Sequence, residues 1–374
     1  MKKSYLFLAG LALMSAFTAC SNDDEVPTQM AQNENTELIV NTVGVSQVNT
    51  KAGIRAGEFT KGESLGLYIY RGDGIKDGAI SGEDAKYNDG TTGISTVNVP
   101  YQQNYNTTGK WGAVQPIMLS NIVGKVYAYY PYIANNNAAG DDVDDGLAVK
   151  VTVNEDQGTG QSSGIEDANG QTDYMWADVN EGVSNMKPVV NLSMNHALAM
   201  ISFTFVQSPD ANDKYPGIGQ VSSIVLKNKD GGAHSPVTTG NATMNISDGT
   251  ITGNAAGSIT VSGITTPTLM DVSSSVNPDL IPRMLVYPSS QNVGNDEAQV
   301  VVTVDGKAYT VDIPALLVAG QPAKWEANKN YEYTLTLRGV ELVVNQVTIK
   351  TWTLVEGNDG GMDVQNPDSQ NRQP

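Results

Sequence analysis

Short apolar runs separated by turn residues recur along most of the chain, and their length and spacing are typical of β-strands. Even- and odd-numbered residues of the run 198–206 would face opposite ways, the period-two pattern of a half-buried strand. No amphipathic helix longer than about ten residues is evident. The predicted strands are 37–48, 64–70, 117–119, 125–130, 147–153, 189–194, 198–206, 221–227, 242–246, 258–261, 283–287, 299–304, 307–313, 331–338 and 342–351.

The connections between these runs predict antiparallel sheets. Asp305-Gly306, between two apolar runs, favours the primed two-residue turn of a tight hairpin. A polar break at residues 208–215 divides the predicted strands into two groups. The simplest architecture is therefore all-β, with two antiparallel β-sandwich domains in tandem, 56–208 and 209–374.

The N-terminus has the pattern of a secretory signal peptide. Lys2 and Lys3 precede an apolar run at 5–13 and small residues up to Ala19. This run is too short to span a bilayer. Cys20, the chain's only cysteine, follows directly and resembles the lipidated cysteine of a bacterial lipobox. We expect a signal peptide at 1–19 and lipid on Cys20, which would anchor the precursor in the outer membrane. The alternative is an ordinary cleaved signal with an incidental cysteine.

Composition excludes several classes of protein. There are 40 acidic residues against 22 basic ones, and the net charge of −18 argues against binding nucleic acid or an anionic membrane through a basic surface. A second cysteine is lacking, so an exported form would depend on its cores rather than on disulfides. About 350 residues remain after the signal, enough for two or three domains.

Catalytic and metal-binding patterns are weak. His196 precedes a predicted strand and His234 lies in a Gly/Ser/Pro loop, and neither accompanies a nucleophile, metal or phosphate motif. The acidic stretch 141–146 fails as a calcium loop because Val143 and Thr152 stand where carboxylate ligands are needed. We therefore predict a protein that is not an enzyme and has no cofactor or metal.

Several motifs, in order along nearly the whole chain, resemble the fimbrillin family. That resemblance implies a pilus subunit with two transthyretin-like β-sandwich domains. Such a subunit is exported as a lipoprotein, cut after a basic residue by a trypsin-like protease, and polymerised with other subunits at the cell surface by donor-strand exchange. The motifs are Phe59-x-x-Gly62-x-x-Leu65-Gly66-Leu67-Tyr68, Trp111, and the runs 126–132, 173–177, 192–199, 325–337 and 347–352.

Strand exchange requires a removable strand and a loop that a protease can cut. The predicted strand 37–48 is followed by a loop of small residues that contains Lys51 and Arg55. We expect residues 20–55 to form a propeptide, with a polar tether at 22–36 and cleavage after Arg55, or alternatively after Lys51. The other interpretation is that both are solvated loop charges, since any exposed loop is easily nicked.

A nine-residue match suggests which segment would be the donor strand. Residues 37–45 (ELIVNTVGV) and 341–349 (ELVVNQVTI) align without gaps and are identical at five positions. Period-two alternation would place Ile39, Val43 and Val45 on one face, and Val343, Val347 and Ile349 on the corresponding face. Chance similarity, or a shared edge position in two related domains, is the alternative. The predicted donor is 341–352, with Leu342, Val343, Val344, Val347 and Ile349 as its apolar residues, and the acidic tail from Glu356 is expected to trail in solvent.

Two functions are consistent with the sequence. The first is a structural pilus subunit that supports adhesion. The second is a surface lipoprotein that does not polymerise and binds glycan or protein through exposed aromatic residues such as Tyr101, Tyr105 and Trp111. Tyrosine and tryptophan are equally common in cores, so the aromatic residues alone do not decide.

Overall fold

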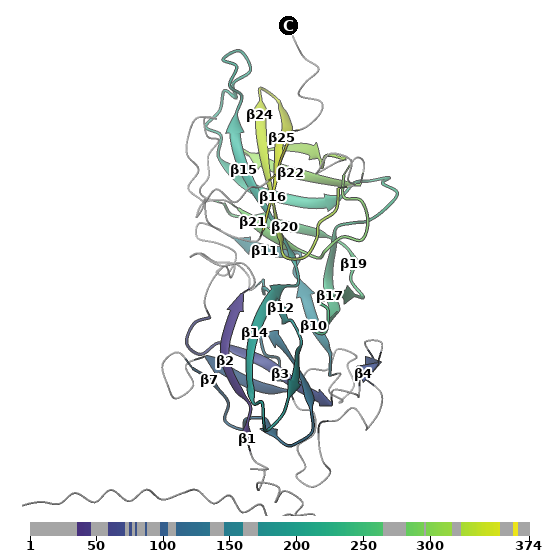
Figure 1. Cartoon of the computed structure of the whole chain (residues 1–374). Coiled ribbons are helices and arrows are strands. Elements are labelled where there is room, and N and C mark those ends of the chain that lie inside the picture. Colours follow the sequence, from purple (N-terminus) through teal and green to yellow (C-terminus); the bar gives the residue numbers. More distant parts are fainter. Residues whose placement is uncertain are drawn as a thin grey trace, which may run out of the picture. The chain divides into compact units, whose positions relative to one another are not determined.

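Every regular element in the computed structural model that can be described is a β-strand (Figure 1). The all-β prediction is therefore confirmed, and the strands pack as β-sandwiches around apolar cores. The described residues are 36–45, 59–71, 75–76, 79–80, 87, 98–103, 110–134, 146–159, 171–264, 282–294, 297–315, 323–351 and 362–365.

The largest sheet gathers most strands of the first half of the chain. Its inward side chains, such as Leu65, Leu67, Val126 and Met194, form one apolar core. β1 (Thr36–Glu37) pairs with β8 (Met118–Leu119), and β4 (Ile75–Lys76) pairs with β5 (Ala79–Ile80). The strand order of the eight-stranded sheet is β2 (Ile39–Val45), β14 (Val189–His196), β12 (Met175–Ala177), β9 (Gly124–Tyr130), β3 (Ser64–Arg71), β6 (Val99–Gln103) and β7 (Trp111–Gly112), with β13 (Asn180–Val183) also beside β9.

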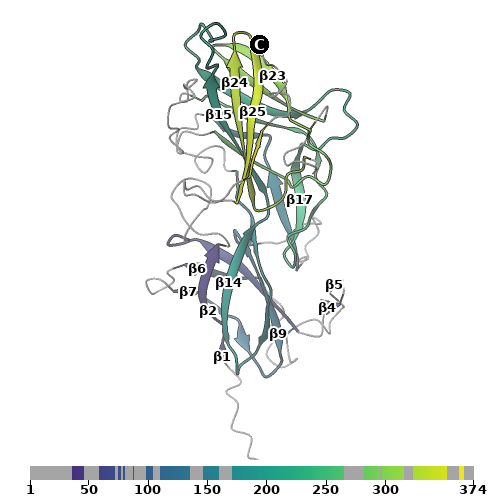
Figure 2. The ribbon, with the colours of Figure 1, turned by 45° about the horizontal axis from the view of Figure 1, so that its top comes forward.

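Three further sheets surround a second core that includes the fully buried Trp325. Figure 2 shows β15, β24 and β25 side by side in one of them. That sheet has the order β21 (Arg283–Val286), β15 (Ala199–Gln207), β24 (Lys329–Arg338), β25 (Glu341–Thr351) and β26 (Met362–Gln365). The other two are β11 (Asp156–Thr159), β20 (Ser258–Ser262), β16 (Val221–Asn228), β22 (Ala298–Val304) and β23 (Lys307–Asp312), and β10 (Ala148–Val153), β17 (Thr238–Asn245) and β18 (Ile251–Thr252), with β19 (Ala255–Ala256) also on β17.

Each run predicted as a strand overlaps a strand of the structure. The Asp305-Gly306 hairpin is confirmed as well, with φ of 48° and 77° and with Val304 paired to Lys307. The Asp305 carboxylate also accepts hydrogen bonds from the backbone N–H groups of Gly219 and Gln220, both at 2.9 Å. The backbone hydrogen bond from Gly219 is the leading cause that lowers the Asp305 pKa below its ordinary value.

Two expectations about strand environment are wrong. β15 is buried on both faces rather than half-buried, and its polar side chains form hydrogen bonds with side chains of the neighbouring strand β24. Ser202 Oγ, for example, donates to Asn330 Oδ1 at 3.0 Å. The sheets are also not purely antiparallel, since β2 pairs with β14, β15 with β24, and β11 with β20 in parallel.

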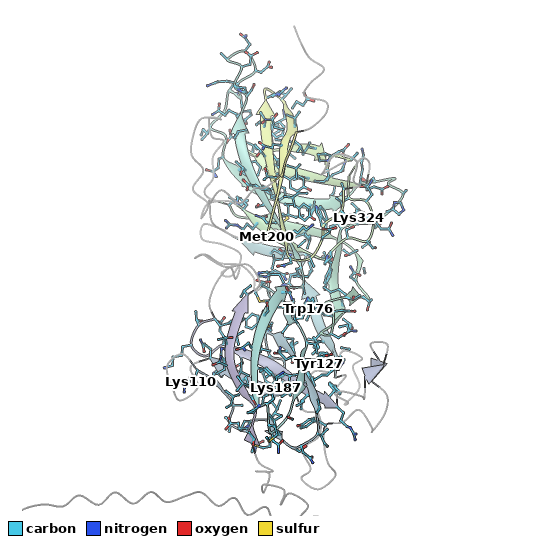
Figure 3. The ribbon with its side chains drawn as sticks, viewed as in Figure 1. Lys110, Tyr127, Trp176, Lys187, Met200 and Lys324 are labelled. Carbon is cyan, nitrogen blue, oxygen red and sulfur yellow. The ribbon has the colours of Figure 1, made fainter. Side chains whose placement is uncertain are left out.

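Strand pairing does not follow the predicted boundary at residues 208/209. β10, β11 and β15 precede this position, yet each pairs with a strand that follows it. Trp176 of β12, labelled in Figure 3, packs against Gly249 in the turn between β17 and β18. A Cβ at Gly249 would lie 2.1 Å from Trp176 Nε1, and the φ of +73° at Gly249 also favours glycine.

Candidate functional site

The predicted removable segment forms an edge of the eight-stranded sheet. Within the described part of the chain, β2 has β14 as its sheet neighbour and runs parallel to it (Figure 1). Two backbone hydrogen bonds secure the start of β2, from Leu38 N–H to the Ile117 carbonyl and from Ile39 N–H to the Pro188 carbonyl, both at 2.8 Å. An edge strand with such contacts could leave only if another strand satisfied the same groups.

Apolar side chains of this segment enter the core of the sheet. Leu38, Val40 and Val45 are buried, and Val43 is half-buried against the same core. Each fully buried Leu or Val side chain contributes about 1.5–3 kcal/mol. Val190, Leu192 and Met194 of β14 are buried in the same core. Without residues 36–45, this part of the core would face an open apolar groove.

A buried tyrosine fixes the backbone at Leu38. Tyr101 Oη donates to the Leu38 carbonyl at 3.2 Å and accepts from the Ile117 N–H at 3.1 Å. Burial raises the pKa of Tyr101 above its ordinary value, the hydrogen bond from Ile117 opposes this, and the Glu37 carboxylate adds to it. The hydroxyl therefore stays protonated and remains a donor to the Leu38 carbonyl.

The side chains of β2 do not alternate with a period of two along the whole strand. The pairing with β14 shifts between Val40, opposite Val190, and Thr42, opposite Asn191, so that Asn41 is an extra residue in a β-bulge. Leu38 and Val40 face the core before the bulge, and Val43 and Val45 do so after it. The prediction that Ile39 shares a face with Val43 and Val45 is therefore wrong, and the Ile39 side chain is 49% exposed.

A polar cluster holds the bulge from the neighbouring strand. Asn191 Oδ1 accepts hydrogen bonds from Asn41 Nδ2 at 2.9 Å and from Thr42 Oγ1 at 2.8 Å. Asn191 is on the exposed face of β14, between the buried Val190 and Leu192. One carbonyl oxygen on β14 thus contacts both the bulged residue of β2 and the residue after it.

The predicted donor segment forms β25, which lies between β24 and β26. Leu342, Val344 and Val347 are buried, whereas Val343 and Ile349 are half-buried. The pairing with β24 shifts between Val344, opposite Leu335, and Gln346, opposite Thr334, so Asn345 is also a bulged residue.

The two matched segments thus share a structural pattern in addition to a sequence. Asn41 and Asn345 occupy the same position in the nine-residue alignment, and each is the bulged residue of its strand. Leu and Val at the matched positions before the bulge are buried in both strands. Inspection of the sequence missed the bulges because it assumed uninterrupted alternation. The shared asparagine, a residue uncommon inside strands, was the available signal.

The tail after β25 differs from expectation. Residues 356–374 were expected to trail in solvent, but the backbone of Met362–Gln365 forms β26 and pairs antiparallel with β25 from Gln346 to Ile349. The expectation was wrong because it considered only the composition of the tail and not the open edge of β25. Trp352, at the end of the predicted donor, lies outside the described residues.

Several other predicted residues lie outside the described part of the chain, namely Cys20, Lys51, Arg55, Tyr105 and the acidic stretch 141–145. The proposed aromatic platform does not form among the rest. Tyr101 is buried in the core, and Trp111 packs edge-on against Phe59 with ring centroids 5.4 Å apart.

The histidines have structural partners. His196 is fully buried and its Nδ1 lies 3.0 Å from Asp173 Oδ1, while His234 Nδ1 lies 3.2 Å from Glu297 Oε1. No group of three or more metal-ligating side chains occurs in the described residues. The described part of the chain likewise contains no helix with the length and apolarity needed to cross a membrane.

The fold is that of an all-β sandwich protein in which β2 forms a parallel edge strand beside β14. The chain belongs to the fimbrillin-like family, whose model matches residues 50–352. Fimbrillins are structural proteins of fimbriae, so this chain is a pilus-related protein of the cell surface. The match begins after β2 and ends directly after β25.

Several solved structures are similar to this chain, and the one with a TM-score above 0.5 supports the fold. A protein assigned to cell adhesion from Bacteroides ovatus ATCC 8483 has a TM-score of 0.55 at 15% identity, over 86% of this chain and 99% of that one. A second such protein, from Bacteroides uniformis ATCC 8492, has a TM-score of 0.49 at 19% identity, over 85% and 99%. The tip fimbrial protein Mfa3 from Porphyromonas gingivalis, truncated at its C-terminus, has a TM-score of 0.44 at 12% identity, over 85% and 100%. Among curated proteins, none matches.

Proposed function

We propose that this chain is a pilus subunit that polymerises by donor-strand exchange. The precursor is exported as a lipoprotein with its lipid on Cys20, in the outer membrane. A trypsin-like protease cuts after Arg55 or Lys51 and frees the segment that carries β2. Residues 341–352 of a neighbouring subunit then fill the groove that this segment leaves. The alternative, a lipid-anchored monomer that binds glycan or protein, lacks a supporting observation, because Tyr101 and Trp111 pack within the fold.

The observation that carries the proposal is the correspondence between β2 and β25. Both segments, 37–45 and 341–349, bury a leucine and a valine before an asparagine bulge and apolar side chains after it. A donor must present side chains to the same pockets and backbone groups to the same ladder as the strand it replaces. The family match also starts at residue 50, so the segment with β2 lies outside it.

The N-terminus of the cell-surface protein tests the processing step. We expect fibres that begin at residue 56 and that run as a ladder in SDS without boiling. Arg55→Ala with Lys51→Ala should leave β2 in place and give folded, unpolymerised precursor. Lys61→Ala is the matched control, because Lys61 is an exposed basic residue of the adjacent described segment. Normal fibres from the double variant would contradict the cleavage step.

The lipid anchor has a separate test. Intact-mass analysis of the wild-type precursor should show acyl addition, and Cys20→Ala should abolish it and mislocalise the protein. A lipidated monomer that begins at Cys20 and forms no ladder would favour the alternative function.

A further inference from the structure

The apolar side chains of the donor do not by themselves fix its register in the groove. In the register of the match, Val344, Val347 and Ile349 would lie opposite Val190, Leu192 and Met194, as Val40, Val43 and Val45 do now. If the donor slipped by two residues, Leu342, Val344 and Val347 would lie opposite the same three residues of β14. Both registers bury three apolar side chains, so hydrophobic burial separates them poorly.

The position of the bulge does separate these two registers. In the matched register, the bulged Asn345 lies beside Asn191, as Asn41 does now. In the slipped register, Asn345 would lie beyond Leu192, and Val343 would face Asn191. Bulges are rare in parallel pairs, so the coincidence of the β2 bulge with Asn191 is a specific feature of this edge.

We propose that Asn191 determines the register of the incoming donor strand by binding its asparagine bulge. The side-chain Nδ2 of Asn345 takes the place of Asn41 Nδ2, and the side-chain amide of Gln346 takes the place of the Thr42 hydroxyl. Both groups donate to Asn191 Oδ1. The partner is thus a second copy of this chain, or a related subunit with an Asn-Gln or Asn-Thr pair at this position. This inference rests on the proposed function, because it requires residues 341–352 to be the donor.

Cysteine pairs distinguish the two registers in assembled fibres. Val189 lies opposite Ile39 now, so it would lie opposite Val343 in the matched register and opposite Glu341 in the slipped one. None of the three reporter positions belongs to the polar cluster, and Cys20 is the chain's only natural cysteine. We expect Val189→Cys with Val343→Cys to give an intermolecular disulfide ladder in non-reducing SDS, about tenfold more than Val189→Cys with Glu341→Cys, because two hydrogen bonds favour the matched register.

Three substitutions, each made in both double-cysteine variants, test the role of Asn191. Asn191→Ala should lower the ratio of the two crosslinks about tenfold, since both hydrogen bonds are lost. Asn191→Asp should preserve the ratio, because a carboxylate oxygen still accepts from both donors. Ser193→Ala, at the next exposed position of β14, is the matched control and should change nothing.

The outcomes separate this inference from the proposed function. An unchanged ratio in Asn191→Ala fibres would overturn the role of Asn191 and leave the donor assignment standing. If the ratio of the two crosslinks also falls in Asn191→Asp fibres, the role of Asn191 would likewise be overturned. The acceptor oxygen would then not determine the register. If neither cysteine pair crosslinks between subunits in fibres with Asn191 intact, residues 341–352 are not the donor and both ideas fail.

Discussion

Leu38→Ala separates the stability of the precursor from that of the fibre. The Leu38 side chain is 1% exposed and lies in the same core as Ile117. Truncation of a buried leucine to alanine costs about 2–5 kcal/mol in lost transfer free energy and cavity formation. This is a large share of a typical unfolding free energy of about 5–15 kcal/mol. The precursor should therefore unfold at a clearly lower urea concentration.

The fibre should not respond to the same substitution, because Leu38 belongs to the segment that is removed. Its equivalent in the donor is Leu342, so Leu342→Ala should weaken both the precursor and the SDS-resistant ladder. Ile39→Ala is the matched control at a 49% exposed neighbour and should change stability by no more than about 0.5 kcal/mol. The assays are urea unfolding of the uncut precursor and the temperature at which the fibre ladder dissociates in SDS. A weaker ladder from Leu38→Ala fibres would show that the segment stays in the fibre and would refute the reasoning.

Three further perturbations have definite expected outcomes. Truncation after Arg338 should abolish assembly and also lower subunit stability in urea, because β25 buries Leu342, Val344 and Val347 in its own sheet; normal fibres would mean another donor. Truncation after Gly361 removes β26, which pairs with one edge of β25. Because β25 would then be held less firmly in its own subunit, assembly measured by light scattering should be faster. An unchanged or slower rate would contradict the idea that β26 retains β25. Burial, with a contribution from Glu181, raises the pKa of Tyr127 to about 12. The unfolded tyrosine loses its proton near pH 10, so the stabilisation is complete below about pH 10 and is lost as the pH rises through about 12. Urea unfolding across this range should be less pH-dependent in Tyr127→Phe, and identical profiles would contradict this.

Strand positions were predictable because the chain alternates short apolar runs with turn residues. Asp305-Gly306 is a clear case, since the turn chemistry alone gave the hairpin and its register. Short strands such as β12 (Met175–Ala177) were missed because three residues carry almost no periodicity. β15 was misjudged because a strand with Ser202 and Thr204 on one side resembles a half-buried strand until its neighbours are known.

The pairing of distant strands was harder to predict than their existence. β2 lies beside β14 although about 150 residues separate them, and their parallel direction leaves no local signal such as a hairpin turn. The match between 37–45 and 341–349 drew attention to two segments that share a bulge position, but period-two reasoning put Ile39 and Val343 on the inner face. One inserted residue reverses the alternation, and the sequence offers only Asn41 and Asn345 as a hint of where this happens.

The proposed exchange must be driven by more than the difference in contacts. β25 buries Leu342, Val344 and Val347 in its own subunit, and it would bury a similar set in a neighbour's groove. Leaving one site and filling the other is therefore nearly balanced in hydrophobic burial. Before cleavage, β2 is tethered to its groove and competes at a high effective concentration. After cleavage, the freed segment rebinds only in proportion to its bulk concentration, whereas a donor within a growing fibre stays close to its acceptor. Cutting near Arg55 would thus set the direction of exchange without any change in the contacts of the groove.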